Sequence, residues 1–201
     1  MYVIGRASQT SGLTINVLDA STGADLYQLN IDGIVVAPTI VLLAVDVAED
    51  GSLYAANMTD TPAQPYRLYR WVNSDSNTLP MLVYSGDPGV PNLAGLRWGD
   101  TMDVRGAGTN TEIIVDANTG SAAALFKATS EAMDSFVPTP FSQTYGSGSI
   151  GRSLEFGAGD TFWQKRHASR LQLSSYDLAA PSSTPVTNYA NFPNTLGPVS
   201  L

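Results

Sequence analysis

The stretch VLDASTGADLYQL (residues 17–29) contains a pentapeptide, Asp-Ala-x-Thr-Gly, that the chain repeats in IVDANTGSAAALF (residues 114–126). In both places β-branched residues precede the aspartate, and an alternating or apolar segment follows the glycine, which is typical of two strands joined by a turn. Asp side chains bond the backbone two residues on, and Gly takes a positive φ at no steric cost. Each copy therefore predicts a β-hairpin, and the repetition predicts a repeated β unit.

Two further hairpins are expected, in YRLYRWVNSDSNTLPMLVYSG (residues 66–86) and in SRLQLSSYDLAAPSSTPVTNYANF (residues 169–192). The turn positions Asp19, Asp75, Asp116 and Asp177 are spaced by about 50 residues on average, which is in the range of propeller blades. We therefore expect an all-β fold, a β-propeller or propeller segment of about four four-stranded blades. The approximate units are 1–36, 37–92, 93–146 and 147–201.

Two parts of this repeat are irregular. MYVIGR (residues 1–6) reads as the second strand of a unit whose first strand is missing. Either the C-terminal NTLGPVSL pairs with that unit and closes a small ring, or the ring continues in further blades or in other copies of the chain. SAAALFKATSEAMDSF (residues 121–136) is rich in helix formers. The glycine that closes the turn before it favours a strand to about Ala128, with loops at Asn73 to Pro80 and Phe136 to Gly148.

The composition excludes several functional classes. The 201 residues carry 10 basic and 18 acidic side chains, a net charge of −8, and such an anionic surface disfavours nucleic acids. The absence of Cys excludes disulfides and thiolate metal sites, and no apolar run is long enough for membrane insertion. Charged residues make up only 14%, and polar turn residues are abundant, a texture common in secreted proteins. We expect an extracellular or cell-surface location, although no signal peptide is visible in this chain.

Three acidic residues occupy similar positions in the predicted innermost strands: Asp46, Asp103 and Glu155. Innermost strands line the channel of a propeller, so these carboxylates are candidates to converge there. Together they would bind sugar hydroxyls or a hard cation such as Ca²⁺, which prefers oxygen ligands. The alternative is that they bond turn backbone or pair with Arg105 and Arg152, which lie close to two of them in the sequence.

Aromatic residues form a second candidate site. Trp71 and Trp98, with Trp163, Tyr66 and Tyr69, are candidates for a face that stacks on carbohydrate or contacts a protein partner. The favoured alternative is ordinary packing between blades, where aromatic rings fill the wedge-shaped space.

Other motifs give weaker signals. His167 is the only histidine, and the chain has no G-x-S-x-G elbow, so we expect a polar turn there and not a catalytic triad. NSDSNT (residues 73–78) alternates oxygen-bearing side chains but lacks the Gly and Glu that an EF-hand loop requires. We expect it to be a plain hairpin turn.

Several stretches resemble bacterial β-propeller domains of the quinoprotein-like or NHL-like kind, and more closely the propeller domains of unknown function in large secreted bacterial proteins. They are DGSLYAANM, YRLYRWVNSD, RWGDTMDVRGAGTNTEIIV and SLEFGAGDTFWQK, which cover much of residues 44–177. The resemblance implies a propeller, extracellular or surface-attached, with a binding or scaffolding role. It supplies no catalytic residues, and the tryptophan-docking motifs of quinoproteins are not evident, so it implies no quinone cofactor.

The leading functional expectation is a non-catalytic extracellular module that binds protein or glycan or serves as a scaffold. We expect no cofactor, with Ca²⁺ at the channel carboxylates as the one exception considered. Two alternatives stay open. One is a structural subunit of a surface assembly or filament, possible as a homo-oligomer, and the other is a propeller hydrolase or lyase that uses the channel carboxylates.

Overall fold

The computed structural model describes residues 1–35, 40–59, 64–117, 122–142, 153–165, 173–179 and 187–189. Within these ranges the chain forms four antiparallel sheets and no α-helix, which confirms the all-β class. One short 3₁₀ segment, η1 (Gly108–Asn110), follows the first strand of the third sheet.

Each sheet is a meander whose strands pair in chain order. Sheet 1 has three strands and sheets 2 to 4 have four each. Sheet 1 comprises β1 (Tyr2–Gly5), β2 (Thr14–Leu18) and β3 (Asp25–Gln28). Sheet 2 comprises β4 (Ile40–Val47), β5 (Leu53–Met58), β6 (Tyr66–Trp71) and β7 (Met81–Gly86). Sheet 3 comprises β8 (Trp98–Arg105), β9 (Glu112–Ala117), β10 (Ala122–Ala128) and β11 (Phe136–Ser142), and sheet 4 comprises β12 (Leu154–Phe156), β13 (Thr161–Lys165), β14 (Leu173–Asp177) and β15 (Thr187–Tyr189).

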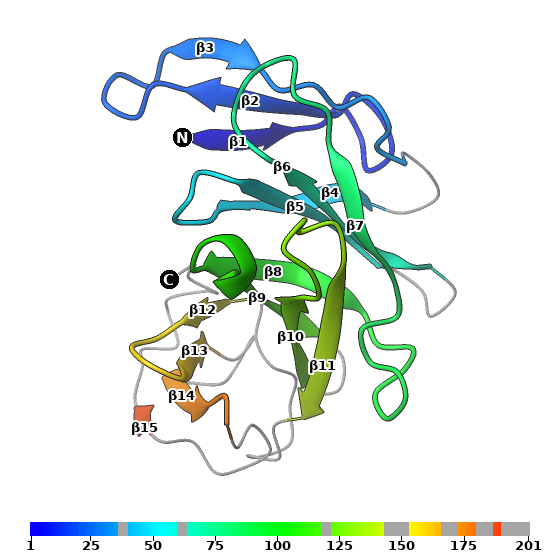
Figure 1. The fold of residues 1–201 in the computed structure, drawn as a ribbon, viewed down its shortest axis with the longest axis vertical. Helices are drawn as coiled ribbons and strands as arrows, with labels where there is room; N and C mark the ends of the chain where they lie inside the picture. The colour runs from blue at the N-terminus through cyan, green and yellow to red at the C-terminus, as the bar shows by residue number, and fades with distance from the viewer. Residues whose placement is uncertain are drawn as a thin grey trace.

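The sheets follow one another along the long axis of the molecule, from sheet 1 at the top of Figure 1 to sheet 4 at the bottom. Their first strands are neighbours, because β1 contacts β4, β4 contacts β8, and β8 contacts β12. Side chains from three or more sheets therefore come together along this row of first strands.

Apolar clusters fill the space between successive sheets. The strand β5 shows how, because all six of its residues are buried and its side chains alternate between two clusters. Leu53 and Ala55 pack with residues of sheet 1, whereas Tyr54 and Ala56 pack with residues of sheet 3. Such two-sided burial explains why this strand lacks the polar alternation of a half-exposed strand.

The two copies of the pentapeptide have different roles in the fold. Asp19 follows β2 and caps its own turn by accepting hydrogen bonds from the backbone N–H groups of Ser21 and Thr22. Asp116 lies inside β9, completely buried, and its Oδ1 accepts the backbone N–H of Thr101 in β8 at 2.7 Å. Residues 118–121 of the second turn lie outside the described ranges.

One expected loop is a strand. Residues 136–142, expected to begin a loop, form β11 and pair with β10 along its whole length. This strand contains two prolines, Pro138 and Pro140, and proline cannot donate to a β-ladder. The structure accommodates them because β11 is the outermost strand of sheet 3 and needs donors on one side only. The helical alternative for residues 121–136 is also excluded over Ala122–Ala128, which form β10.

Candidate functional site

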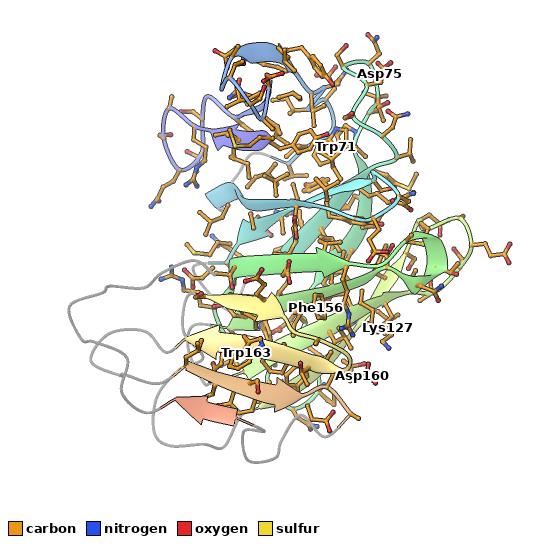
Figure 2. All side chains as sticks on the ribbon, turned by 90° about the vertical axis from the view of Figure 1, so that its left-hand side faces the viewer. Trp71, Asp75, Lys127, Phe156, Asp160 and Trp163 are labelled. Atoms are coloured by element: carbon orange, nitrogen blue, oxygen red, sulfur yellow. The ribbon has the colours of Figure 1, made fainter. Side chains whose placement is uncertain are left out.

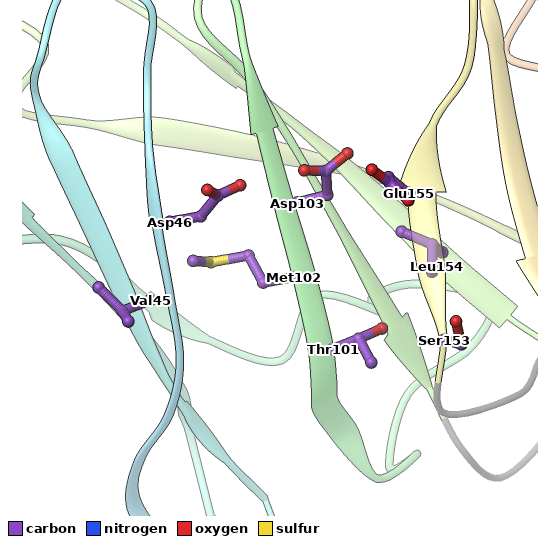
Figure 3. A pocket seen from close by; sticks show the side chains of 8 residues that line it. All are labelled: Val45, Asp46, Thr101, Met102, Asp103, Ser153, Leu154 and Glu155. Atoms are coloured by element: carbon purple, nitrogen blue, oxygen red, sulfur yellow. The ribbon is translucent and has the colours of Figure 1, made fainter. Parts of the chain in front are cut away.

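A pocket of about 320 Å³ lies along the first strands of sheets 2, 3 and 4 (Figure 3). We call it the inner-strand pocket, and it is lined by Val45, Asp46, Thr101, Met102, Asp103, Ser153, Leu154 and Glu155. The three carboxylates singled out from the sequence, Asp46, Asp103 and Glu155, lie one on each of β4, β8 and β12. The structure thus brings these three residues to one site.

Two of the carboxylates join neighbouring sheets through the backbone. Asp46 in sheet 2 accepts the backbone N–H of Val104 in sheet 3 at 2.8 Å. Asp103 in sheet 3 likewise accepts the backbone N–H of Phe156 in sheet 4. Since Val104 follows Asp103 and Phe156 follows Glu155, the same contact is repeated from one sheet to the next. We call this repeated contact the inter-sheet latch.

Asp103 holds its proton unusually well. Burial raises the pKa of this carboxyl to about 7, and the nearby carboxylates of Asp46 and Glu155 add to the shift, while the N–H of Phe156 opposes it. The N–H of Val104 lies within hydrogen-bond distance of both Asp46 and Asp103, so these two carboxyl groups are close neighbours. Near neutral pH, Asp103 is therefore partly protonated.

Arg105 does not neutralise the pocket. Its guanidinium donates to the Glu112 carboxylate, with Nε at 2.8 Å, and to the carbonyl of Gly159, and it stacks over the Phe156 ring at 4.3 Å. Lys127 binds the other oxygen of Glu112 at 2.6 Å. These residues lie at one end of sheets 3 and 4, where Figure 2 labels Phe156, Lys127 and Asp160.

The other suggested partner, Arg152, lies outside the described ranges. Within those ranges, no basic side chain forms an ion pair with any of the three pocket carboxylates. The negative charge of the pocket is therefore not compensated there by a salt bridge.

Two polar residues of the pocket were missed in the sequence analysis. Thr101 and Ser153 each stand two positions before an acidic residue, Asp103 and Glu155, and line the same pocket. The signal that identifies them is the two-residue period of a strand, which places residues i and i+2 on one face.

A second cavity, of about 400 Å³, adjoins the inner-strand pocket along the row of first strands. It is lined by residues 2–4 of β1, 43–45 of β4 and 100–102 of β8. The two cavities share Val45, Thr101 and Met102. The open space thus extends along the first strands of sheets 1 to 4.

The described residues give no support to a metal site. They contain no group of three or more His, Cys, Asp or Glu side chains placed to hold a metal ion. In the pocket, the backbone N–H groups already occupy oxygens of Asp46 and Asp103. In NSDSNT, Asp75 accepts the backbone N–H of Asn77 at 2.8 Å, as expected for a hairpin turn between β6 and β7.

Trp71 and Trp98 are buried in the cores, which rules out an exposed stacking face built on them. Trp71 packs between sheets 1 and 2 (Figure 2), and its Nε1 donates to the carbonyl of Asn30 at 2.8 Å. Trp98 belongs to the cluster between sheets 2 and 3 together with Tyr66. Packing between sheets, the alternative favoured from the sequence, describes both tryptophans.

Two further candidates have different outcomes. Trp163 is partly exposed and stands directly opposite Glu155 in the register of β12 and β13. His167 lies outside the described ranges, so its expected position in a polar turn stays a prediction.

The part of the chain that the structure describes contains no helix long and apolar enough to span a membrane.

Comparison with known proteins gives a structural similarity only. No family model matches the sequence, and no curated protein matches it. The fold is similar to the crystal structure of a DUF4623 family protein from Bacteroides eggerthii DSM 20697, with a TM-score of 0.65 and 14% sequence identity. The match covers 92% of this chain and 42% of that protein, so this chain spans less than half the length of the protein it resembles.

Proposed function

We propose that this chain is a non-catalytic binding or scaffolding module, and that its four sheets are sectors of a β-propeller or of a propeller segment. The observation that carries the proposal is the row of adjacent first strands, which encloses a pocket while apolar clusters fix the sheets to one another. A rigid sheet framework around a polar pocket is an arrangement that many binding sites share. Solution X-ray scattering from the full chain tests the propeller geometry, because a flat stack of sheets has a larger maximum dimension than the same sheets arranged as radial sectors.

The hydrogen bonds of the pocket favour binding over catalysis. Asp46 and Asp103 use their oxygens on backbone N–H groups of the next sheet, which makes them structural acceptors. A general base must instead have an oxygen within reach of the proton that it removes. These two carboxylates are therefore occupied and do not form a pair available for acid–base catalysis. What the pocket offers a ligand is recognition by charge and shape.

The proposed partners are a protein or a glycan, met outside the cell or at its surface. The low content of charged residues and the many polar turns are compatible with that location. The test is a glycan array probed with the labelled chain, followed by mass analysis of the glycans that it retains. Retention with unchanged glycan mass supports a binding module, whereas shortened or unsaturated glycans would show that the module is an enzyme.

One observation favours a second candidate, a hydrolase or lyase. The pKa of Asp103 is raised to about 7 by burial and by neighbouring carboxylates, and such a shift is common for general acids. Glu155 beside it would act as the second carboxylate. Turnover of a panel of aryl glycosides that disappears in Asp103→Asn would establish this activity, and turnover at equal rates in both proteins would assign it to a contaminant.

A further inference from the structure

We propose that the inner-strand pocket binds the primary ammonium group of a small aliphatic amine. This inference deepens the binding role proposed above and rests on it, because it assigns a chemical class of ligand to the same pocket. Four features carry it: the uncompensated negative charge, the open acceptors of Glu155, the buried hydroxyl of Ser153 and the apolar walls.

The charge of the pocket calls for a cation. Three carboxyl groups line about 320 Å³ of space, and none of them forms an ion pair with a basic side chain of the described residues. The nearest basic residue along β8, Arg105, is committed to Glu112 and to the ring of Phe156. A ligand that brings a positive charge supplies the compensation that the described side chains do not.

Glu155 is the acceptor that remains available. In the inter-sheet latch, Asp46 and Asp103 each accept a backbone N–H from the following sheet. Glu155 occupies the equivalent place in sheet 4, but no hydrogen bond to its carboxylate exists in the described structure. Among the described residues nothing occupies its two oxygens, which suit charge-assisted hydrogen bonds from the three N–H donors of an ammonium group.

Ser153 is an independent sign of a ligand. Its side chain is only 3% exposed and lines the pocket, yet its Oγ has no hydrogen-bond partner within the described part of the chain. Buried hydroxyl groups are almost always hydrogen-bonded, so an isolated one calls for an explanation. An ammonium donor held between Glu155 and Ser153 satisfies both groups, since both line the same pocket (Figure 3).

The walls of the pocket suit an aliphatic body on that ammonium. Val45, Met102 and Leu154 supply apolar surface beside the acidic residues. A bare metal ion would make no use of this surface, and the described residues offer no cluster placed to hold one. A short alkyl amine uses both the charge and the apolar surface, and the volume lies at the lower end of the range for small-molecule sites.

The test is calorimetric titration of the full chain with 1,4-diaminobutane. 1,4-Butanediol is the matched neutral ligand, of the same chain length, and calcium chloride is the metal arm. We expect the diamine to bind, the diol to bind at least about tenfold more weakly, and calcium to produce no saturable heat. Equal affinity for diamine and diol, or calcium binding tighter than that of the diamine, would overturn the inference.

The variants locate the site. Glu155→Gln keeps the shape of the side chain and removes its charge, and we expect it to weaken diamine binding about tenfold. Glu131→Gln makes the same charge change at an exposed position away from the pocket, and we expect unchanged affinity. Equal losses in the two variants would show diffuse attraction to an anionic surface and would defeat the proposal.

A second variant covers the case in which Glu155→Gln fails to fold. Ser153→Ala removes the buried hydroxyl without adding volume, and we expect it to weaken diamine binding; unchanged affinity would overturn the site.

Failure of the amine site and failure of the proposed non-catalytic function give different results. Glycan or protein binding without amine binding removes this inference alone, whereas turnover of a retained glycan removes the proposed non-catalytic function and leaves the amine site standing.

Discussion

The carboxylate of Asp103 accepts a hydrogen bond from the backbone N–H of Phe156, a residue of the next sheet. Asp46 makes the same contact one sheet earlier, with Val104. The sheets are therefore joined at their first strands by carboxylate-to-backbone hydrogen bonds in addition to the apolar clusters. Unlike apolar packing, these bonds have a direction and fix the relative height of adjacent strands.

The first prediction concerns the inter-sheet latch. Asp103→Ala leaves the partly buried N–H of Phe156 without its acceptor, so we expect the free energy of unfolding to fall by about 1–3 kcal/mol. Asp25→Ala is the control, because it makes the same side-chain truncation at an exposed position in β3 and should change stability by less than about 0.5 kcal/mol. Urea unfolding at slightly acidic pH measures both. Equal losses would show that the bond to Phe156 contributes nothing to stability.

The order of strands was predictable because its determinants are local. Turn residues such as Gly23, which has φ 73°, and β-branched segments such as residues 13–19 act over a few positions. The convergence of Asp46, Asp103 and Glu155 on one pocket was also accessible, since it follows from placing equivalent positions on adjacent first strands. Both inferences need only the repeat and the two-residue period of a strand.

The role of each carboxylate was not accessible from the sequence. Asp19 and Asp116 stand in the same pentapeptide, yet Asp19 caps its own turn at the surface, whereas Asp116 is buried in β9 and binds the neighbouring strand β8. The difference depends on what packs over each turn, which no local pattern encodes. The prolines of β11 illustrate the same limit, because only the position of a strand within its sheet decides whether a missing donor matters.

The second prediction concerns the pH dependence of stability. Burial raises the pKa of Asp116 to about 8, with the charge of Asp100 adding to the shift and the N–H of Thr101 opposing it. In an unfolded chain an Asp titrates near pH 3.9. Between these two values the folded protein holds a proton that the unfolded chain releases. The stability from this group is therefore complete below the unfolded pKa and is lost as pH rises toward about 8, with a limiting slope of about 1.4 kcal/mol per pH unit.

Asp116→Asn tests this linkage. The amide keeps an oxygen for the N–H of Thr101 but binds no proton, so the free energy of unfolding should fall less steeply with pH than in the unmodified chain. Denaturant unfolding at several values between about pH 5 and 8 gives the two slopes. Asp25→Asn is the matched control, and its free energy of unfolding should change with pH as steeply as that of the unmodified chain. If Asp116→Asn also shows the same slope as the unmodified chain, Asp116 is ionised in the folded protein.

The third prediction compares two buried tryptophans. Trp71 donates from Nε1 to the carbonyl of Asn30, whereas Nε1 of Trp98 is buried with no hydrogen-bond partner among the described residues. Replacement by Phe removes similar apolar volume in both cases but breaks a hydrogen bond only at Trp71. We expect Trp71→Phe to destabilise the chain by about 1 kcal/mol more than Trp98→Phe. Chemical unfolding of the two variants side by side measures this difference. An equal loss of stability in both would contradict the assignment.

The fourth prediction concerns the backbone at the start of β8. Gly99 has φ 90°, a conformation that strains any residue with a Cβ, and it lies where the pairing of β8 with β9 is interrupted between Trp98 and Met102. A Cβ at this position would also collide with the backbone carbonyl of Asn57 and press on the ring of Tyr66. That carbonyl belongs to a fully buried strand, so it has little freedom to withdraw.

Gly33 supplies the control, because its φ of 94° is nearly the same while a Cβ there would meet nothing within 4 Å. Gly33→Ala should therefore show the cost of backbone strain alone, about 1–3 kcal/mol. Gly99→Ala adds the collision with a buried strand, so we expect a larger loss, or failure to fold. Thermal and urea unfolding of both variants separates the two contributions. A loss at Gly99 no greater than that at Gly33 would show that sheets 2 and 3 are able to move apart at this point, against the close approach of Gly99 to β5 in this fold.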